Sequence, residues 1–399
     1  MRHPTRWAGA YALVAAILAT AFAAGILSGP YRAVQRSDYM TYQTAGRIVL
    51  DGHGDCLYTV ACQSEAQHAL IGDEPSFPRG ALPFTSPPWL AALVLPLAGL
   101  PLAVAFAAFT LASLLLLALA AWRLAWGDRA TRLVAVVLVL SAWPTTMGAI
   151  RGQSTLAVAA LLGLSASASM ASSEMRAGTL AGLAALKPTL VPIWLIRLAA
   201  ERRWRSLAVA ATVMAVLVAV AALLVSRRAV AEYPAYLFNL AASSDAIGVH
   251  VDQMINWRGA GVRLGAGSLF VAVGVLVTLG TVTVAWWWGR GSPRGTALGV
   301  ATAFVATPLV IPHANQHEAI LAILGLLNAI AALQELRLRL ATAAICLQAA
   351  LWVGPLLTEQ ASAWLLFGTL LASLIGLTAL SLRERRRYFR PVLVRPGTD

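Results

Sequence analysis

Long apolar runs recur along almost the whole of this 399-residue chain and limit its fold more than any other feature. Leu102 to Ala125 and Ser268 to Trp288 are two of them, and each has the length of roughly 20 residues that a helix needs to cross a bilayer. Only 12% of the residues are charged, which excludes an ordinary soluble domain. Because backbone polar groups cannot stay unpaired in lipid, the spans must be helices. We predict an all-α polytopic membrane protein with about 10–12 transmembrane helices, broken or re-entrant elements included.

The formal charge of +13 comes from arginines that cluster in short segments between the apolar runs. This pattern indicates membrane topology under the positive-inside rule, and we expect no nucleic acid as a partner. The basic clusters Arg123 to Arg132, Arg202 to Arg205 and Arg383 to Arg390 are assigned to the cytoplasmic side, as are both termini. The first run, Trp7 to Leu27, is then a retained signal anchor.

Two apolar stretches are interrupted by prolines and suit broken or re-entrant helices better than full spans. They are Pro83 to Gly99, and Ala177 to Ala200 with its break at Lys187-Pro188. Counting both as full spans would move the Arg123 to Arg132 cluster outside. We predict one transmembrane domain over 1–382, with outer loops at 28–100 and 226–263, followed by a basic cytoplasmic tail at 383–399. No repeat of about 20–50 residues is evident, which gives an inverted-repeat transporter no support.

Polar residues at the membrane boundaries collect on the outer side in this topology. Such groups are costly near hydrocarbon and are usually retained for a site, although each one alone can simply lie among wet headgroups. Asp38 follows the first span, where a short membrane-parallel helix would hold it as a general base or leave it as a solvated loop acid. Lys187, the only lysine, stands at a helix break, where it can bind a phosphate or be structurally paired. The collection comprises Asp38, Tyr42, Arg151, Gln153, Asn256, Arg258, Arg263, His313, Asn315, Gln316, His317 and Glu318.

The histidines and cysteines give weaker signals. His313 and His317 are four residues apart and are expected to share one helix face. Because no third ligand stands at a comparable spacing, we expect phosphate or hydroxyl contacts, no metal site and no cofactor, although a divalent metal stays open. Cys56 and Cys62 share a polar loop and can form a disulfide if that loop is extracytoplasmic, whereas Cys346 lies in an apolar run.

A series of short motifs runs from Asp38 to His317. They are Asp38-Tyr39 with Tyr42 and Ala45, Gly52 with Leu57-Tyr58, Phe84-Thr85-Ser86-Pro87-Pro88, Gly152-Gln153, Lys187-Pro188 followed by Arg202-Arg203-Trp204-Arg205, and His313 with His317. In this order they resemble the membrane-embedded C-type glycosyltransferases, in particular family 87, which contains polyprenyl-phosphomannose-dependent mannosyltransferases. The segment from Cys56 to Pro83 is longer and more polar than the family pattern, which leaves the acceptor open.

The resemblance implies inverting transfer of a sugar, with mannose expected first, from a polyprenyl-phosphate donor to a hydroxyl of a lipid or glycan acceptor. It places this reaction on the outer face of a bacterial cytoplasmic membrane, with Asp38 as general base and one of His313 and His317 in the site. Candidates for the donor phosphate are Lys187, Arg151, Arg258 and Arg263, and candidates for the sugar or acceptor are Tyr42, Gln153, Asn256 and Gln316. A lipid-linked glycan ligase and a secondary transporter are the alternative classes.

Overall fold

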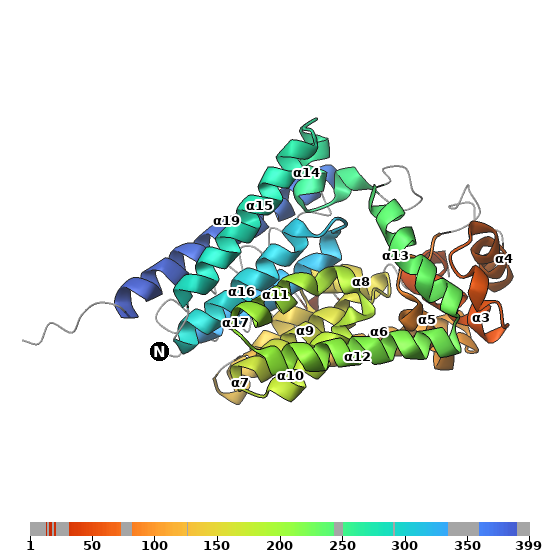
Figure 1. The fold of residues 1–399 in the computed structure, drawn as a ribbon, viewed down its shortest axis with the longest axis horizontal. Coiled ribbons are helices and arrows are strands. Elements are labelled where there is room, and N and C mark those ends of the chain that lie inside the picture. The colour runs from red at the N-terminus through yellow and green to blue at the C-terminus, as the bar shows by residue number, and fades with distance from the viewer. Residues whose placement is uncertain are drawn as a thin grey trace, which may run out of the picture.

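The computed structural model describes residues 32–72, 82–125, 127–242, 250–289, 292–333 and 359–388, with isolated positions between 13 and 20. Every regular element in these ranges is a helix, which confirms the all-α prediction (Figure 1). The predicted signal anchor Trp7 to Leu27 lies almost wholly outside the described residues, and Cys346 lies outside them. The total number of spans therefore stays a prediction.

Four described helices are long and apolar enough to cross a membrane. They occur in α6 (Leu102–Leu124), α12 (Trp204–Leu224), α15 (Ser268–Gly289) and α19 (Glu359–Tyr388). Large apolar side chains remain exposed along them, such as Leu223 on α12 and Leu269 on α15. Faces of this kind suit lipid as the surrounding solvent, so the chain is a multi-pass membrane protein. The predicted basic tail begins inside α19, which continues as a helix to Tyr388.

The stretch around Lys187 is broken as predicted. It consists of α10 (Glu174–Leu183), the short 3-10 helices η2 (Ala184–Leu186) and η3 (Pro188–Leu190), and α11 (Pro192–Ala200). Lys187 lies between η2 and η3 with a φ of -132° and a ψ of 83°, which is outside the helical region that a following proline disfavours. The Pro-rich stretch near residue 90 forms α5 (Pro88–Ala98), whose 11 residues are too few for a span.

The apolar run Leu133 to Ile150, which the predicted topology has crossing the membrane outward, is a bent pair of helices rather than one continuous helix. The chain forms α7 (Arg129–Leu140) and α8 (Trp143–Ile150), which are bent by 55° relative to each other. Pro144 lies in the first turn of α8, where its missing amide hydrogen is tolerated, so the proline favours a new helix start over a continuous one.

Most helices surround one large hydrophobic core, which we call the bundle core. It is built mainly from alanine, leucine and valine, with Leu162, Trp194 and Phe304 among its buried members. α9 (Thr155–Met170), α16 (Pro293–Val310) and α17 (Ile320–Ala332) are buried along much of their length within it. The short elements η4 (Val251–Gln253), α14 (Trp257–Arg263) and η5 (Gln316–Ala319) connect the longer helices.

A second core lies at one end of the molecule, where α3 (Asp38–Leu50), α4 (Val60–Ile71), α5 and α13 (Arg227–Ala242) gather (Figure 1). We call it the aromatic core after its buried Tyr39, Tyr42, Tyr58, Phe84 and Tyr233. Its other elements are α2 (Arg32–Gln35), η1 (Gly54–Cys56) and the start of α6.

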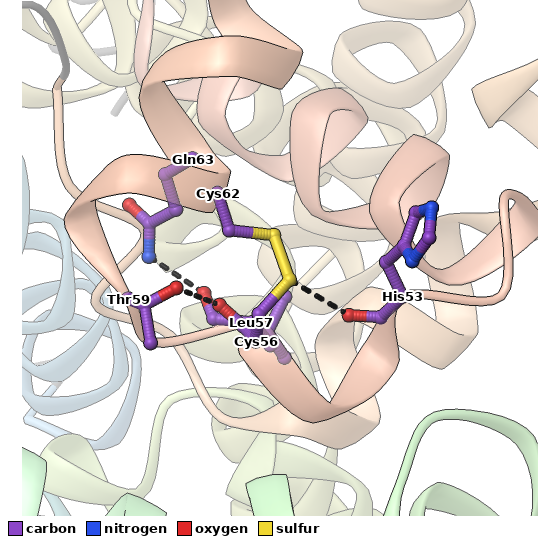
Figure 2. The surroundings of a disulfide bond; sticks show 6 residues. All are labelled: His53, Cys56, Leu57, Thr59, Cys62 and Gln63. Atoms are coloured by element: carbon purple, nitrogen blue, oxygen red, sulfur yellow. Dashed lines mark hydrogen bonds between the residues drawn. A yellow bond between two sulfur atoms is a disulfide. The ribbon is translucent and has the colours of Figure 1, made fainter.

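A disulfide joins Cys56 and Cys62 across the start of α4, as the sequence allowed (Figure 2). The neighbouring Gln63 side chain donates to the Leu57 carbonyl at 2.7 Å and accepts from the Phe84 amide at 2.8 Å. One turn later, Gln67 donates to the Leu82 carbonyl and accepts from the Leu82 amide. α4 thus holds the irregular segment 82–86 in place through side-chain hydrogen bonds.

Candidate active site

A cavity of about 160 Å³ opens where the aromatic core meets the bundle core. Its wall comes from the start of α3, segment 82–87, the turn after α8, the break around Lys187, α13 and the turn between α16 and α17. A cavity of similar size, roughly 150 Å³, takes up one benzene ring, whereas drug-sized ligands need about 300–1,000 Å³. It brings together seven of the predicted site residues, Asp38, Tyr42, Arg151, Gln153, Lys187, His313 and His317.

Asp38 is presented to this cavity by the first turn of α3. Ser37 caps the helix by accepting a hydrogen bond from the Met40 amide, and an acidic residue at this end is favoured by the helix dipole. The Gln153 side-chain amide donates to Asp38 Oδ2 at 2.5 Å. This contact holds one carboxylate oxygen, while the partly exposed side chain still faces the cavity.

Tyr42 and Gln153 extend the same hydrogen-bond network. The Tyr42 hydroxyl donates to Gln153 Oε1 at 3.4 Å, so both ends of this amide have assigned partners. Burial and then the nearby charge of Asp38 raise the pKa of Tyr42 well above its usual value, which keeps the phenol a neutral donor.

Gly152 allows α3 to approach the turn that carries Gln153. It has a φ of +60°, and a Cβ atom there would lie 2.6 Å from Tyr39 Cβ. The Tyr39 amide also donates to the Arg151 carbonyl at 3.3 Å. A larger residue at position 152 would both strain the backbone and separate Asp38 from Gln153.

Lys187 is structurally paired and also faces the cavity, so a structural ion pair and a role in phosphate binding are compatible with each other. Its ammonium donates to Thr155 Oγ1 at 2.7 Å and forms an ion pair with Glu318. The Lys187 side chain is 22% exposed and the Glu318 side chain is fully buried. The positive charge therefore remains accessible from the cavity while the negative charge lies behind it.

Glu318 belongs to the predicted collection of polar residues on the outer side, but no individual role in the site was predicted for it. Its carboxylate also lies 3.0 Å from His317 Nε2 and accepts from Thr155 Oγ1 at 3.3 Å and from the Asn315 amide at 2.7 Å. The last contact belongs to a capping box at the start of η5. The spacing Asn-x-x-Glu before an apolar run is the signal that could have marked this residue as ordered.

The prediction that His313 and His317 share one helix face is wrong, although both side chains line the cavity. α16 ends at Val310, Pro312 follows, and a new element begins only at Gln316, so His313 lies in the turn and His317 in η5. Burial lowers the pKa of His313 to about 4, against the opposing charge of Glu318. The ring is therefore neutral at neutral pH.

Four predicted site residues do not line the cavity. Asn256 caps α14 and donates to the Ile311 carbonyl, whereas Arg263 donates to the carbonyls of Asp252 and Met254 and covers the Trp364 ring. Gln316 accepts from the Trp143 indole. Arg258 lies 3.5 Å from the Pro312 carbonyl. Such contacts to backbone and aromatic groups give these residues structural roles that hydropathy and charge patterns do not reveal.

One wall of the cavity is formed by α13 and segment 82–87, which had no predicted role in the site although the motif Phe84 to Pro88 lies in this part of the chain. Tyr233 and Leu237 of α13 and Leu82, Pro83 and Pro87 make this wall largely apolar. Tyr233 stacks on Tyr58 at 5.7 Å between ring centroids, and the Tyr58 hydroxyl donates to the Ser86 carbonyl at 2.9 Å.

Among the described residues, no group of three His, Cys, Asp or Glu side chains has an arrangement that could hold a metal ion. The absence of a metal requirement remains an expectation from the sequence. The polar groups that line the cavity can remove a proton, through Asp38, and face an anion, through Lys187 and Arg151.

Comparison with known proteins identifies the family. Residues 84–312, more than half of the chain, match the family model described as glycosyltransferase family 87. No curated protein and no solved structure matches the chain significantly. The matched range includes Arg151, Gln153 and Lys187, while Asp38, His313 and His317 lie outside it and reach the same cavity through the fold. This chain belongs to glycosyltransferase family 87 and is a multi-pass membrane glycosyltransferase.

Proposed function

We propose that the protein transfers a sugar, mannose first among the candidates, from a polyprenyl-phosphate donor to a hydroxyl of a lipid or glycan, with inversion. The observation that carries this proposal is the placement of the Asp38 carboxylate and the cationic Lys187 and Arg151 around one cavity. A base for the acceptor proton and positive charge for a departing phosphate are the two groups that such a displacement needs.

Asp38 is the proposed general base. Gln153 holds one of its carboxylate oxygens, and no described residue donates to the other, which can accept the proton of an acceptor hydroxyl. As the proton leaves, the hydroxyl oxygen bonds to the anomeric carbon and the bond from that carbon to the phosphate oxygen breaks. Since the phosphate is already a good leaving group, one carboxylate is sufficient for inversion.

Lys187 and Arg151 are the proposed partners of the leaving phosphate. The Arg151 guanidinium is exposed and makes no hydrogen bond or ion pair with the described residues, which leaves its donors available to a ligand. His313 is neutral and can donate one further hydrogen bond. The cavity has room for about one sugar ring, so the polyprenyl chain would lie outside it, past the apolar residues Leu82, Tyr233 and Leu237.

The Cys56–Cys62 disulfide supports an extracytoplasmic position for the cavity, on the outer face of a bacterial cytoplasmic membrane (Figure 2). Disulfides persist in oxidising compartments and are rare in the cytosol. The disulfide packs against the aromatic core, and α3, which contributes Tyr42 to that core, presents Asp38 and Tyr42 to the cavity. Both termini would then be cytoplasmic.

The test compares wild type with Asp38→Asn for transfer of radiolabelled mannose from polyprenyl-phosphomannose to membrane lipid, at matched expression. We expect the transfer rate of the variant to be lower than that of wild type by roughly 100-fold or more, which is the range for removal of a general base. Asp51→Asn is the matched control, because Asp51 caps the opposite end of α3 and is exposed. Wild-type rates in Asp38→Asn would exclude this base, and no transfer by wild type would point to another donor sugar or another reaction class.

A lipid-linked glycan ligase is the second candidate, because Arg151 and His313 border the same cavity. A ligase would depend on Arg151 and His313 and little on Asp38. Loss of transfer in Arg151→Gln with normal transfer in Asp38→Asn would favour it. We also propose that no metal is required, and transfer that stops on chelation with EDTA and returns with a divalent ion would contradict this.

A further inference from the structure

Glu318 makes more contacts than its role in the capping box of η5 requires. Its side chain is fully buried and touches Lys187, His317, Thr155 and the Asn315 amide. A glutamine at this position of a capping box would serve the cap equally well. A buried carboxylate is costly unless it is paired, so the charge itself needs another explanation.

The charge faces two groups that border the cavity, Lys187 and His317. Without Glu318, the flexible lysine side chain would retain only Thr155 as a described partner at its ammonium. With Glu318 behind it, the ammonium is held at the cavity wall with one side still exposed. Holding a cation in place before a phosphate arrives lowers the reorganisation needed during reaction.

The same cap also orients the two histidines. Because the Glu318 carboxylate accepts a hydrogen bond from His317 Nε2, the His317 ring carries a proton on this nitrogen. Asn315 Oδ1 accepts from the Glu318 backbone amide, which turns its NH₂ group toward His313 Nε2 at 3.2 Å. The neutral His313 therefore carries its proton on Nδ1, and Nε2 accepts a hydrogen bond in His313 but donates one in His317.

We propose that Glu318 is a positioning residue for the phosphate-binding side of this site, acting through Lys187 and His317 rather than touching the substrate. This inference rests on the proposed function, because it assumes that a polyprenyl phosphate occupies the cavity. It assigns to the Asn315–Glu318 cap a role beyond starting a helix.

The decisive variant is Glu318→Gln, which retains the size of the side chain and the cap but removes the charge. We expect a loss of roughly 10–100-fold in transfer, the range for residues that orient a ligand-binding group in metal sites. In a Lys187→Met background, Glu318→Gln should add little further loss, because its effect passes through Lys187. Fully additive losses would overturn the proposal, as would normal transfer in Glu318→Gln.

Glu201→Gln is the matched control. Glu201 pairs with the buried Arg197 at 2.6 Å, and neither residue lines the cavity. We expect this variant to unfold at a lower temperature in detergent while its transfer rate per folded molecule is unchanged. Glu318→Gln should instead lower the transfer rate per folded molecule while its unfolding temperature stays close to that of wild type. If transfer falls only in proportion to the amount of folded protein, Glu318 has a structural role and the proposal is overturned.

Binding of polyprenyl phosphate to the purified protein separates this inference from the proposed function. If wild type binds it and Glu318→Gln binds about 10-fold more weakly, the positioning role stands even when mannose is not the sugar transferred. Equal binding by both proteins would overturn the positioning role and leave the proposed function intact. If the wild-type protein neither binds polyprenyl phosphate nor transfers a sugar, both the positioning role and the proposed function are overturned.

Discussion

The bundle core and the aromatic core are held together by different means. The bundle core packs small aliphatic residues between long helices, some of whose outer faces expose leucines such as Leu223 and Leu269. In the aromatic core, stacked rings combine with buried glutamines, Gln63 and Gln67, that bind irregular backbone. Close packing of small residues suits helices that associate in lipid, because the burial of apolar surface contributes little to helix association there. Irregular backbone instead requires explicit hydrogen-bond partners.

The cavity draws its groups from both sides of this division. Asp38 and Tyr42 belong to α3 beside the aromatic core, whereas Lys187 and His317 adjoin the bundle core. The proposed base and the proposed phosphate-binding groups thus depend on how two differently stabilised regions meet. Perturbing each region separately should therefore affect stability and transfer to different extents.

The largest expected effect on stability comes from a cavity in the bundle core. Leu162→Ala removes a buried side chain of α9 and should lower the free energy of unfolding by about 2–5 kcal/mol. Thermal unfolding in detergent measures this effect. Because Leu162 does not line the cavity, transfer per folded molecule should be unchanged. A large loss of specific activity would mean that the two regions are not separable.

Gln63→Leu tests the aromatic core. It leaves the Phe84 amide and the Leu57 carbonyl without this partner, at a cost of roughly 2–4 kcal/mol for two buried groups. Since segment 82–87 borders the cavity, transfer per folded molecule should fall as well. The control is Glu65→Leu, an exposed position on the same helix. Unchanged transfer in Gln63→Leu would show that α4 does not position the cavity wall.

Removal of the disulfide should have a smaller effect. Replacing Cys56 and Cys62 by alanine opens a short loop and should lower the free energy of unfolding by about 2 kcal/mol. Reduction of wild type should produce the same shift in unfolding temperature, and the double variant should not respond to reductant. A response of the double variant would mean that another thiol is involved.

The smallest expected effect concerns pH. A histidine whose pKa is lowered from 6.5 to about 4 binds fewer protons when folded, so stability falls as the pH falls from 6.5 toward 4. Between pH 6.5 and pH 5 this amounts to on the order of 1–2 kcal/mol. Thermal unfolding across this range should show the loss in wild type and a smaller loss in His313→Gln. His53→Gln, at an exposed position, should behave like wild type.

The fold class and the helix breaks could be predicted because they depend on local properties. Hydropathy located α6 and α15 within a few residues, and the Lys187-Pro188 dipeptide located a break. The bend between α7 and α8 could not be located in this way, because Pro144 is acceptable both in a first helical turn and in a distorted span. His313 and His317 were misassigned to one helix for a similar reason, since a spacing of four does not show whether the helix is continuous.

The sequence by itself determined that this chain is an all-helical membrane protein with a resemblance to family 87. The lengths of the apolar runs can be read directly from the sequence, and a single chain segment can cross lipid only as a structure whose backbone polar groups are paired. Only the tertiary structure decided which polar residues meet. Asp38 and Gln153 are 115 residues apart, and Lys187 and Glu318 are 131 apart. Their pairing depends on how the helices pack, which also left Asn256, Arg258, Arg263 and Gln316 outside the cavity. Local patterns define elements, whereas a site requires the distances between them.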